Sequence, residues 1–127
     1  MNRKIKSLLI IPGKEPQLVK IPASSKFIKS LVGYNLQKIK LNNDVTLIAN
    51  KNARIDDANR ILGDSVILGT FLIVNTKNNV YVGLNKRQIN RYSNSFLLKK
   101  HQIKIDLFKD EYFRNLYSIK NSKALVA

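Results

Sequence analysis

The sequence contains no cysteine and a single histidine, His101. The absence of cysteine excludes disulfides, zinc–thiolate sites and cysteine nucleophiles, and it is typical of a reducing cytosol. A Ser-His-Asp triad or a multi-histidine metal site would have to include His101. Lysines flank this residue, so we expect its ring to be exposed. We therefore predict no enzymatic activity, no cofactor and no bound metal.

Long apolar runs are also absent. The longest, residues 8–11 and 71–74, are far shorter than the ~20 residues of a membrane-spanning helix. Basic residues precede the first run, as in a secretion signal, but Pro12 and Gly13 end it too early. The apolar part of a signal is typically about 7–15 residues long. We expect a first strand here, a cytoplasmic location and no membrane partner.

Acidic residues are scarce as well. The chain has 23 Lys and Arg against 8 Asp and Glu, a formal net charge of +15. Two windows, residues 16–43 and 65–105, contain cations but no acid. Such windows are typical of a positive surface rather than a salt-bridged one. Codon bias in an AT-rich genome explains part of the lysine excess but gives no reason for losing acids. The composition therefore predicts an anionic partner.

Short apolar segments alternate with turn residues along the 127-residue chain, which is long enough for one core. The predicted strands cover residues 4–11, 17–21, 36–41, 45–49, 66–74 and 80–84. Hairpins dominate this pattern, so the sheet should be largely antiparallel. We predict an α+β fold, with a small, mostly antiparallel sheet built from hairpins and two or three helices.

The helices are predicted from their capping residues. Ser24 or Ser25 can begin the first helix, and Gly33 can close it in the left-handed conformation. Asn85 can cap a second helix that reaches Tyr92, and Asp106 can cap the last. A short helical turn is possible over residues 57–62. These boundaries divide the chain into a core domain, residues 1–92, and a C-terminal helical extension, residues 93–127, packed on or beside the core.

The second helix carries the best local basic patch. Arg87 and Arg91 are four residues apart and share a helical face, with Lys86 beside them. This face can lie against a phosphate backbone, with Tyr92 stacking or hydrogen bonding, or it can be an ordinary solvated surface. A second basic cluster follows in the chain, and it consists of Lys99, Lys100 and Lys104.

The last predicted helix carries an aromatic stripe. Phe108, Tyr112 and Leu116 are spaced to share one helical face. Such a stripe usually packs on a core, and the alternative is a surface that docks on a partner.

Four short motifs occur in an order that resembles a known family. They are Ile-Pro-Gly-Lys-Glu-Pro at 11–16, Leu-Val-Gly at 31–33, Asn-Arg at 59–60 and Gly-Thr-Phe at 69–71. Their order and rough spacing resemble the family catalogued as domain of unknown function 3846, over roughly residues 5–92. The chain departs from that family at Tyr34, where a second glycine is common, and in replacing its usual acidic surface with lysine.

The resemblance implies a small protein of a bacterial phage, plasmid or other mobile element, with no assigned activity. It also draws attention to Lys14, Asn59 and Arg60, which lie in its motifs. Lys14 can present its ammonium to a phosphate, and Arg60 can clamp a phosphate or carboxylate. The alternatives are a solvated lysine in a turn and an arginine that bonds loop carbonyls.

Three classes of function remain from these observations. The first is a module that binds nucleic acid or a nucleic-acid-containing complex. The second is an anti-defence inhibitor, of anti-CRISPR or anti-restriction type, that docks on an acidic or nucleic-acid-bearing host protein complex. The third, an enzyme, has the least support. We expect a non-catalytic accessory protein of a mobile element in the cytoplasm of a bacterial host, binding a polyanion through its basic surface.

Overall fold

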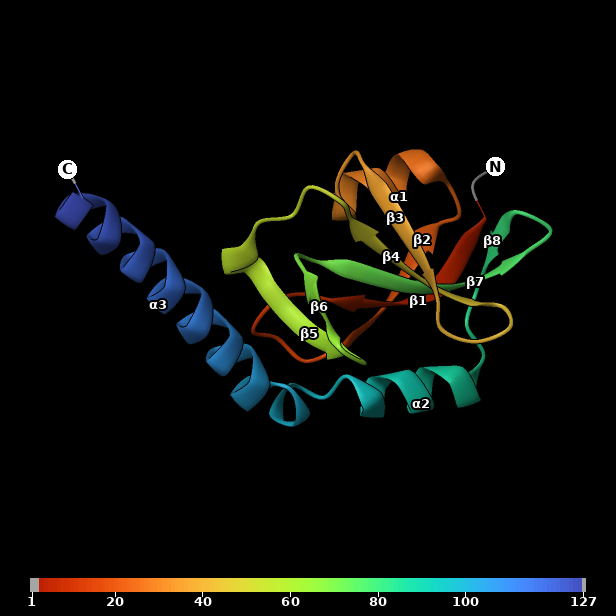
Figure 1. The fold of residues 1–127 in the computed structure, drawn as a ribbon. Helices are drawn as coiled ribbons and strands as arrows, with labels where there is room; N and C mark the ends of the chain where they lie inside the picture. The colour runs from red at the N-terminus through yellow and green to blue at the C-terminus, as the bar shows by residue number, and fades with distance from the viewer. Residues whose placement is uncertain (1–2, 127) are drawn as a thin grey trace.

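A six-stranded antiparallel sheet forms the centre of the computed structural model, with helices on both of its faces (Figure 1). The structure describes the backbone of residues 3–126 and the side chains of residues 3–115. The predicted α+β architecture, with a largely antiparallel sheet and a C-terminal helix, is confirmed.

The strand order of the sheet is β2-β1-β7-β4-β3, and β8 pairs with one end of β7. Its strands are β1 (Lys4–Ile10), β2 (Gln17–Pro22), β3 (Leu36–Lys40), β4 (Val45–Asn50), β7 (Phe71–Lys77) and β8 (Val80–Val82). A separate hairpin consists of β5 (Ala58–Leu62) and β6 (Ser65–Leu68). The helices are α1 (Ser25–Val32), α2 (Lys86–Ser95) and α3 (Gln102–Val126), with short 3-10 turns η1 (Ile55–Asp57) and η2 (Leu98–Lys100).

The central strand β7 is buried on both of its faces over residues 71–75, which explains the unbroken apolar run at 71–74. Phe71 and Ile73 lie on the side covered by α2 and the β5–β6 hairpin. Leu72 and Val74 lie on the side covered by α1. The sheet therefore separates two cores, one on each of its faces.

Helix α1 has the predicted N-cap, but the backbone conformation at its C-terminal end differs from the prediction. The Ser24 side chain accepts a hydrogen bond from the Phe27 N–H at 3.2 Å, which confirms it as the N-cap. Gly33 ends the helix at φ 135° and ψ 164°, an almost exclusively glycine conformation, rather than in the expected left-handed helical one. This conformation leads the chain directly into β3.

Helix α2 has a capping box at its start. The Asn85 side chain accepts from the Gln88 N–H, and the Gln88 side chain accepts from the Asn85 N–H, both at 2.9 Å. The helix continues to Ser95, so the predicted domain boundary after residue 92 falls inside it.

The variant Asn85→Ala should lower the free energy of unfolding by about 1 kcal/mol, because the Gln88 N–H at the start of α2 loses its side-chain acceptor. For a domain of this size, that loss corresponds to a decrease of roughly 2–8 °C in the midpoint of thermal unfolding by circular dichroism. Asn90→Ala, at an exposed position inside α2, is the matched control and should not lower the midpoint. An equal decrease in both variants would contradict the assigned cap.

Two sequence predictions in the middle of the chain are wrong. Residues 57–62 do not form a helical turn, because residues 58–62 are strand β5, which pairs with β6 across Gly63. The predicted strand 66–74 is two strands of different sheets. Gly69, at φ 75°, lets the chain leave the β5–β6 hairpin and enter β7.

Helix α3 starts at Gln102, one turn before the predicted cap Asp106, which instead accepts a hydrogen bond from the Gln102 side chain at 2.8 Å. His101, expected to be exposed, is buried just before the helix. Its Nδ1 accepts from the Ile61 N–H of β5 at 3.1 Å, and its Nε2 donates to the Ser95 carbonyl at 2.8 Å. His101 therefore anchors the start of α3 to the β5–β6 hairpin.

Beyond this anchor, α3 projects away from the sheet (Figure 1). In the predicted aromatic stripe, Phe108 is half-buried and Tyr112 is exposed, while the side chain of Leu116 lies outside the described residues. Ile103 and Leu107 are largely exposed on the same helix. No helix in the described part of the chain is long and apolar enough to cross a membrane.

Candidate functional site

The positive charge of the protein lies on its surface and is not neutralised by its own acids. Among the side chains at positions 3–115, the structure contains one ion pair, between Arg54 Nε and Asp56 Oδ1 at 3.3 Å. All described lysines and arginines except Arg60 and Lys109 are exposed. The excess cations are therefore available to an anionic partner.

The predicted basic patch on α2 divides into exposed and buried parts. Lys86, Arg87 and Arg91 are exposed on the outer side of the helix. Tyr92, predicted to stack or bond with a partner, is buried in the core. The Arg91 guanidinium lies 5.6 Å from the centre of the Tyr92 ring, so Tyr92 supports Arg91 rather than a ligand.

Lysines of the neighbouring strands extend this patch. Side chains alternate along a strand, so Lys4 and Lys6 share the face of β1 that carries Leu8, a member of the core beneath α2. Lys20 of β2 is directly opposite Lys6 in the pairing register. The Leu84 N–H donates to the Lys6 carbonyl at 2.9 Å, which brings the start of α2 to these strands.

We call this surface the α2 face. It consists of Lys4, Lys6, Lys20, Lys86, Arg87 and Arg91, and it includes no acid. The second predicted cluster is also exposed but lies on the following elements, with Lys99 and Lys100 in η2 and Lys104 in α3.

Arg60, considered as a candidate anion clamp, is fully buried in a network of hydrogen bonds. It donates to the carbonyls of Phe96 at 2.8 Å and Lys14 at 2.6 Å, and to Asn59 Oδ1 at 2.8 Å. Burial lowers the pKa of Arg60, and the nearby charge of Glu15 opposes that shift. Of its two proposed roles, the geometry fits the bonding of loop carbonyls.

Asn59 extends the network by donating to the carbonyls of Ile10 at 2.9 Å and Gly69 at 2.8 Å. Three of the four family-like motifs therefore meet at one buried point. Lys14 contributes its backbone carbonyl there, while its side chain is exposed at the β1–β2 turn. These motif residues hold the turn, the β5–β6 hairpin and the end of α2 together.

On the opposite side of the sheet, three adjoining hollows form a groove that the sequence did not predict. Their volumes are about 340, 230 and 500 Å³. The first and second share Lys38 and Tyr81, and the second and third share Lys40, Thr76 and Asn79. We call them together the α1-side groove, whose charged and aromatic lining residues are Lys29, Tyr34, Lys38, Lys40, Asp44, Lys51, Lys77 and Tyr81.

The floor of this groove is polar and ordered. The hydroxyl groups of Thr46 and Thr76 are hydrogen bonded at 2.8 Å. The Lys38 ammonium lies 5.0 Å from the centre of the Tyr81 ring, and the buried Tyr81 hydroxyl has no partner among the described protein atoms. Tyr34, at the end near α1, is 86% exposed. From the sequence, Lys38 and Lys40 could be recognised only as cations of a predicted strand within an acid-free window.

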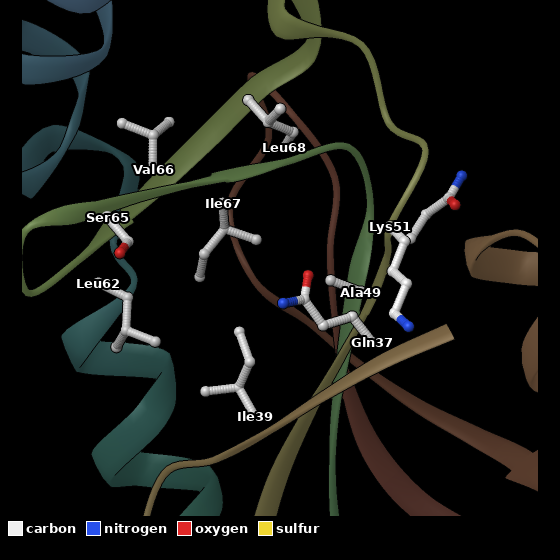
Figure 2. Close-up of a pocket in the computed structure, with 10 residues that line it drawn as sticks. Gln37, Ile39, Ala49, Lys51, Leu62, Ser65, Val66, Ile67 and Leu68 are labelled. Atoms are coloured by element: carbon white, nitrogen blue, oxygen red, sulfur yellow. The ribbon is translucent and has the colours of Figure 1, made fainter. Parts of the chain in front are cut away.

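A separate cavity of about 350 Å³ lies between β3, β4 and the β5–β6 hairpin. Figure 2 shows Ile39, Leu62 and Ile67 pointing toward one another in it, with Lys51 to one side. Its lining has one cation and no acid or histidine, so it offers no pair of groups for acid–base catalysis. Among the described residues, no three histidine, aspartate or glutamate side chains gather as a potential metal site.

Comparison with known proteins supports the family resemblance. A family model described as "Domain of unknown function (DUF3846)" matches residues 5–97. No curated protein and no solved structure matches the chain. The matched segment contains the central sheet except for Lys4, together with α2, whereas η2 and α3 lie outside it.

Proposed function

We propose, from the premise that the chain belongs to the family described as Domain of unknown function (DUF3846), that it is a non-catalytic accessory protein of a mobile element. It binds a polyanion, either a nucleic acid or a nucleic-acid-containing complex, through the α2 face. The observation that supports this proposal is the six exposed cations that the α2 face gathers from β1, β2 and α2 without an acid.

Phosphate contacts are the chemistry that such a surface offers. Lysine and arginine at a phosphate backbone release condensed counterions, so the logarithm of the binding constant falls with the logarithm of the salt concentration by roughly 0.9 per phosphate on duplex DNA. Contacts of this kind fix orientation but carry no sequence information. The proposal therefore predicts tight binding at low salt, weak sequence preference and a steep salt dependence.

Reversing the charge of Arg87 and Arg91 should weaken binding to a short DNA duplex at least tenfold and lower the salt slope by about 2, since two phosphate contacts are lost. Fluorescence anisotropy over a salt series measures both quantities for the double variant Arg87→Glu/Arg91→Glu. The matched control Lys26→Glu/Arg114→Glu makes the same change in net charge. Both of its residues are exposed, and neither belongs to the α2 face or lines the α1-side groove.

The control should retain the wild-type slope and lose less affinity. An unchanged affinity and slope in Arg87→Glu/Arg91→Glu would refute the α2 face as the binding surface. Failure of the wild-type protein to bind DNA or RNA even at low salt, together with a stoichiometric protein complex, would refute nucleic acid as the partner.

A second candidate function, an anti-defence inhibitor that docks on a host protein complex, is favoured by α3. Ile103 is 73% exposed and Leu107 is 62% exposed, and because they are four residues apart they share one face of this projecting helix, where they offer a partner an apolar contact. Under this alternative, Ile103→Asp/Leu107→Asp would abolish the protein complex and leave binding to free DNA intact.

A further inference from the structure

We propose that the α1-side groove is a second binding site, specific for single-stranded nucleic acid. Its lysines hold the phosphates of an extended strand, and Tyr34 stacks on a base. The groove lies on the face of the sheet opposite the α2 face, so it stands independently of the function proposed above.

Charge is the first argument for an anionic ligand. Five lysines of the groove, namely Lys29, Lys38, Lys40, Lys51 and Lys77, face a single acid, Asp44. None of them forms an ion pair with a described side chain. Like charges gathered in a hollow repel one another, and an anion bound among them relieves that repulsion.

Shape favours a chain of repeating units over one small anion. The groove is a succession of three hollows that share their walls, leading from α1 across β3 to the β7–β8 turn. The smallest, at about 230 Å³, lies below the roughly 300–1,000 Å³ of a small-molecule site, and the other two, at about 340 and 500 Å³, lie in the lower half of that range. A free phosphate or nucleotide would fill one hollow only, whereas a polynucleotide places a phosphate and a base at each step along all three.

The aromatic residues favour a single strand over a duplex. Tyr34 is 86% exposed and contributes little to the core, yet it lies in the same hollow as Lys29 and Lys38. An aromatic ring among cations is the usual platform on which unpaired bases stack. The bases of a duplex already stack on each other, so they are not accessible to Tyr34.

The floor of the groove supplies hydrogen-bonding groups for the sugar and phosphate. Thr46 and Thr76 present hydroxyls in the second hollow, and the Asn79 side chain lies beside them. Lys38 now lies over the Tyr81 ring, a weak contact that its ammonium can exchange for a phosphate oxygen.

The experiment compares a labelled oligothymidine with a DNA duplex of the same length by fluorescence anisotropy over a salt series. Lys38→Glu/Lys40→Glu should weaken oligothymidine binding at least tenfold and lower its salt slope by about 1.4, at roughly 0.7 per phosphate on a single strand. Tyr34→Ala should weaken it about five- to a hundredfold and leave the slope unchanged, because stacking involves no counterion. Tyr34→Phe, which keeps the ring, should bind as the wild type does.

The controls separate this site from the α2 face. Arg87→Glu/Arg91→Glu should weaken duplex binding more than oligothymidine binding, and Lys38→Glu/Lys40→Glu should do the reverse. Wild-type oligothymidine binding by both Lys38→Glu/Lys40→Glu and Tyr34→Ala would overturn the groove proposal without affecting the α2 face. If Lys26→Glu/Arg114→Glu lost as much oligothymidine affinity as Lys38→Glu/Lys40→Glu, the groove proposal would also be overturned, because net charge alone would then explain the effect. The altered side chains are exposed, so thermal unfolding should remain that of the wild type.

Discussion

Replacing Arg60 with methionine should destabilise the protein by about 3–5 kcal/mol, which is a large part of the 5–15 kcal/mol typical of a folded domain. The variant leaves the carbonyls of Phe96 and Lys14 and the side-chain oxygen of Asn59 without their donor in a buried site. A buried acceptor that loses its partner costs roughly 1–3 kcal/mol. Two of these acceptors are backbone carbonyls, so no second substitution can remove them.

Urea unfolding followed by circular dichroism measures this loss. With a slope of about 2 kcal/mol per M, the midpoint should fall by roughly 2 M. Arg60→Lys should recover little stability, because an ammonium cannot present the planar set of donors of a guanidinium. Arg54→Met, which removes an exposed arginine from a surface ion pair, is the control and should shift the stability by less than about 1 kcal/mol. Equal midpoints for Arg60→Met and Arg54→Met would show that the network does not hold the fold together.

Gly33→Ala should be the second most damaging change, at roughly 2–4 kcal/mol. A backbone at φ 135° and ψ 164° costs a residue with a side chain about 1–3 kcal/mol in strain. The added Cβ would also lie 2.6 Å from the Asn50 side-chain amide carbon, so Asn50 must move. Because Tyr34 follows directly, we also expect weaker binding of single-stranded DNA in this variant.

Gly63→Ala is the matched control for this prediction. Gly63 also has a positive φ, 60°, but a Cβ there meets nothing within 4 Å. The left-handed conformation costs about 1–2 kcal/mol for a residue with a side chain, so Gly63→Ala should be the milder variant. Differential scanning calorimetry measures the loss of stability in each of the two variants. A smaller loss for Gly33→Ala than for Gly63→Ala would contradict the role assigned to Asn50 and to the unusual backbone.

The local features of the fold were predictable because neighbouring residues determine them. Ser24 and Asn85 cap helices through their own side chains, and Pro12 and Gly13 form the first hairpin turn. The predictions that failed concern segments whose structure depends on contacts with distant parts of the chain. Residues 66–74 are apolar except for Gly69 and Thr70, and only the partners of β6 and β7 show that Gly69 divides two strands of different sheets.

The candidate sites show the same limit. Helical spacing correctly put Arg87 and Arg91 on one exposed face, but burial of Tyr92 and His101 depends on packing against β1 and β5. The α1-side groove joins residues of α1, β3, β4 and the β7–β8 hairpin, whose proximity follows from strand order alone. The spacing of residues along the sequence does not reveal the strand order. The sequence therefore could not predict that Tyr34 and Tyr81 line the same hollow.

The strand order also determines which strands are open to aggregation at high protein concentration. β2 and β3 are the edges of the sheet, where unpaired backbone groups invite another molecule to add a strand and begin an aggregate. Lys20 and Pro22 occupy one edge, and Lys38 and Lys40 the other. Lysine and proline are the residues that block such pairing, because a strand cannot add without burying a charge or losing a donor. Part of the lysine excess therefore acts as protection against self-assembly, in addition to any role in binding a partner.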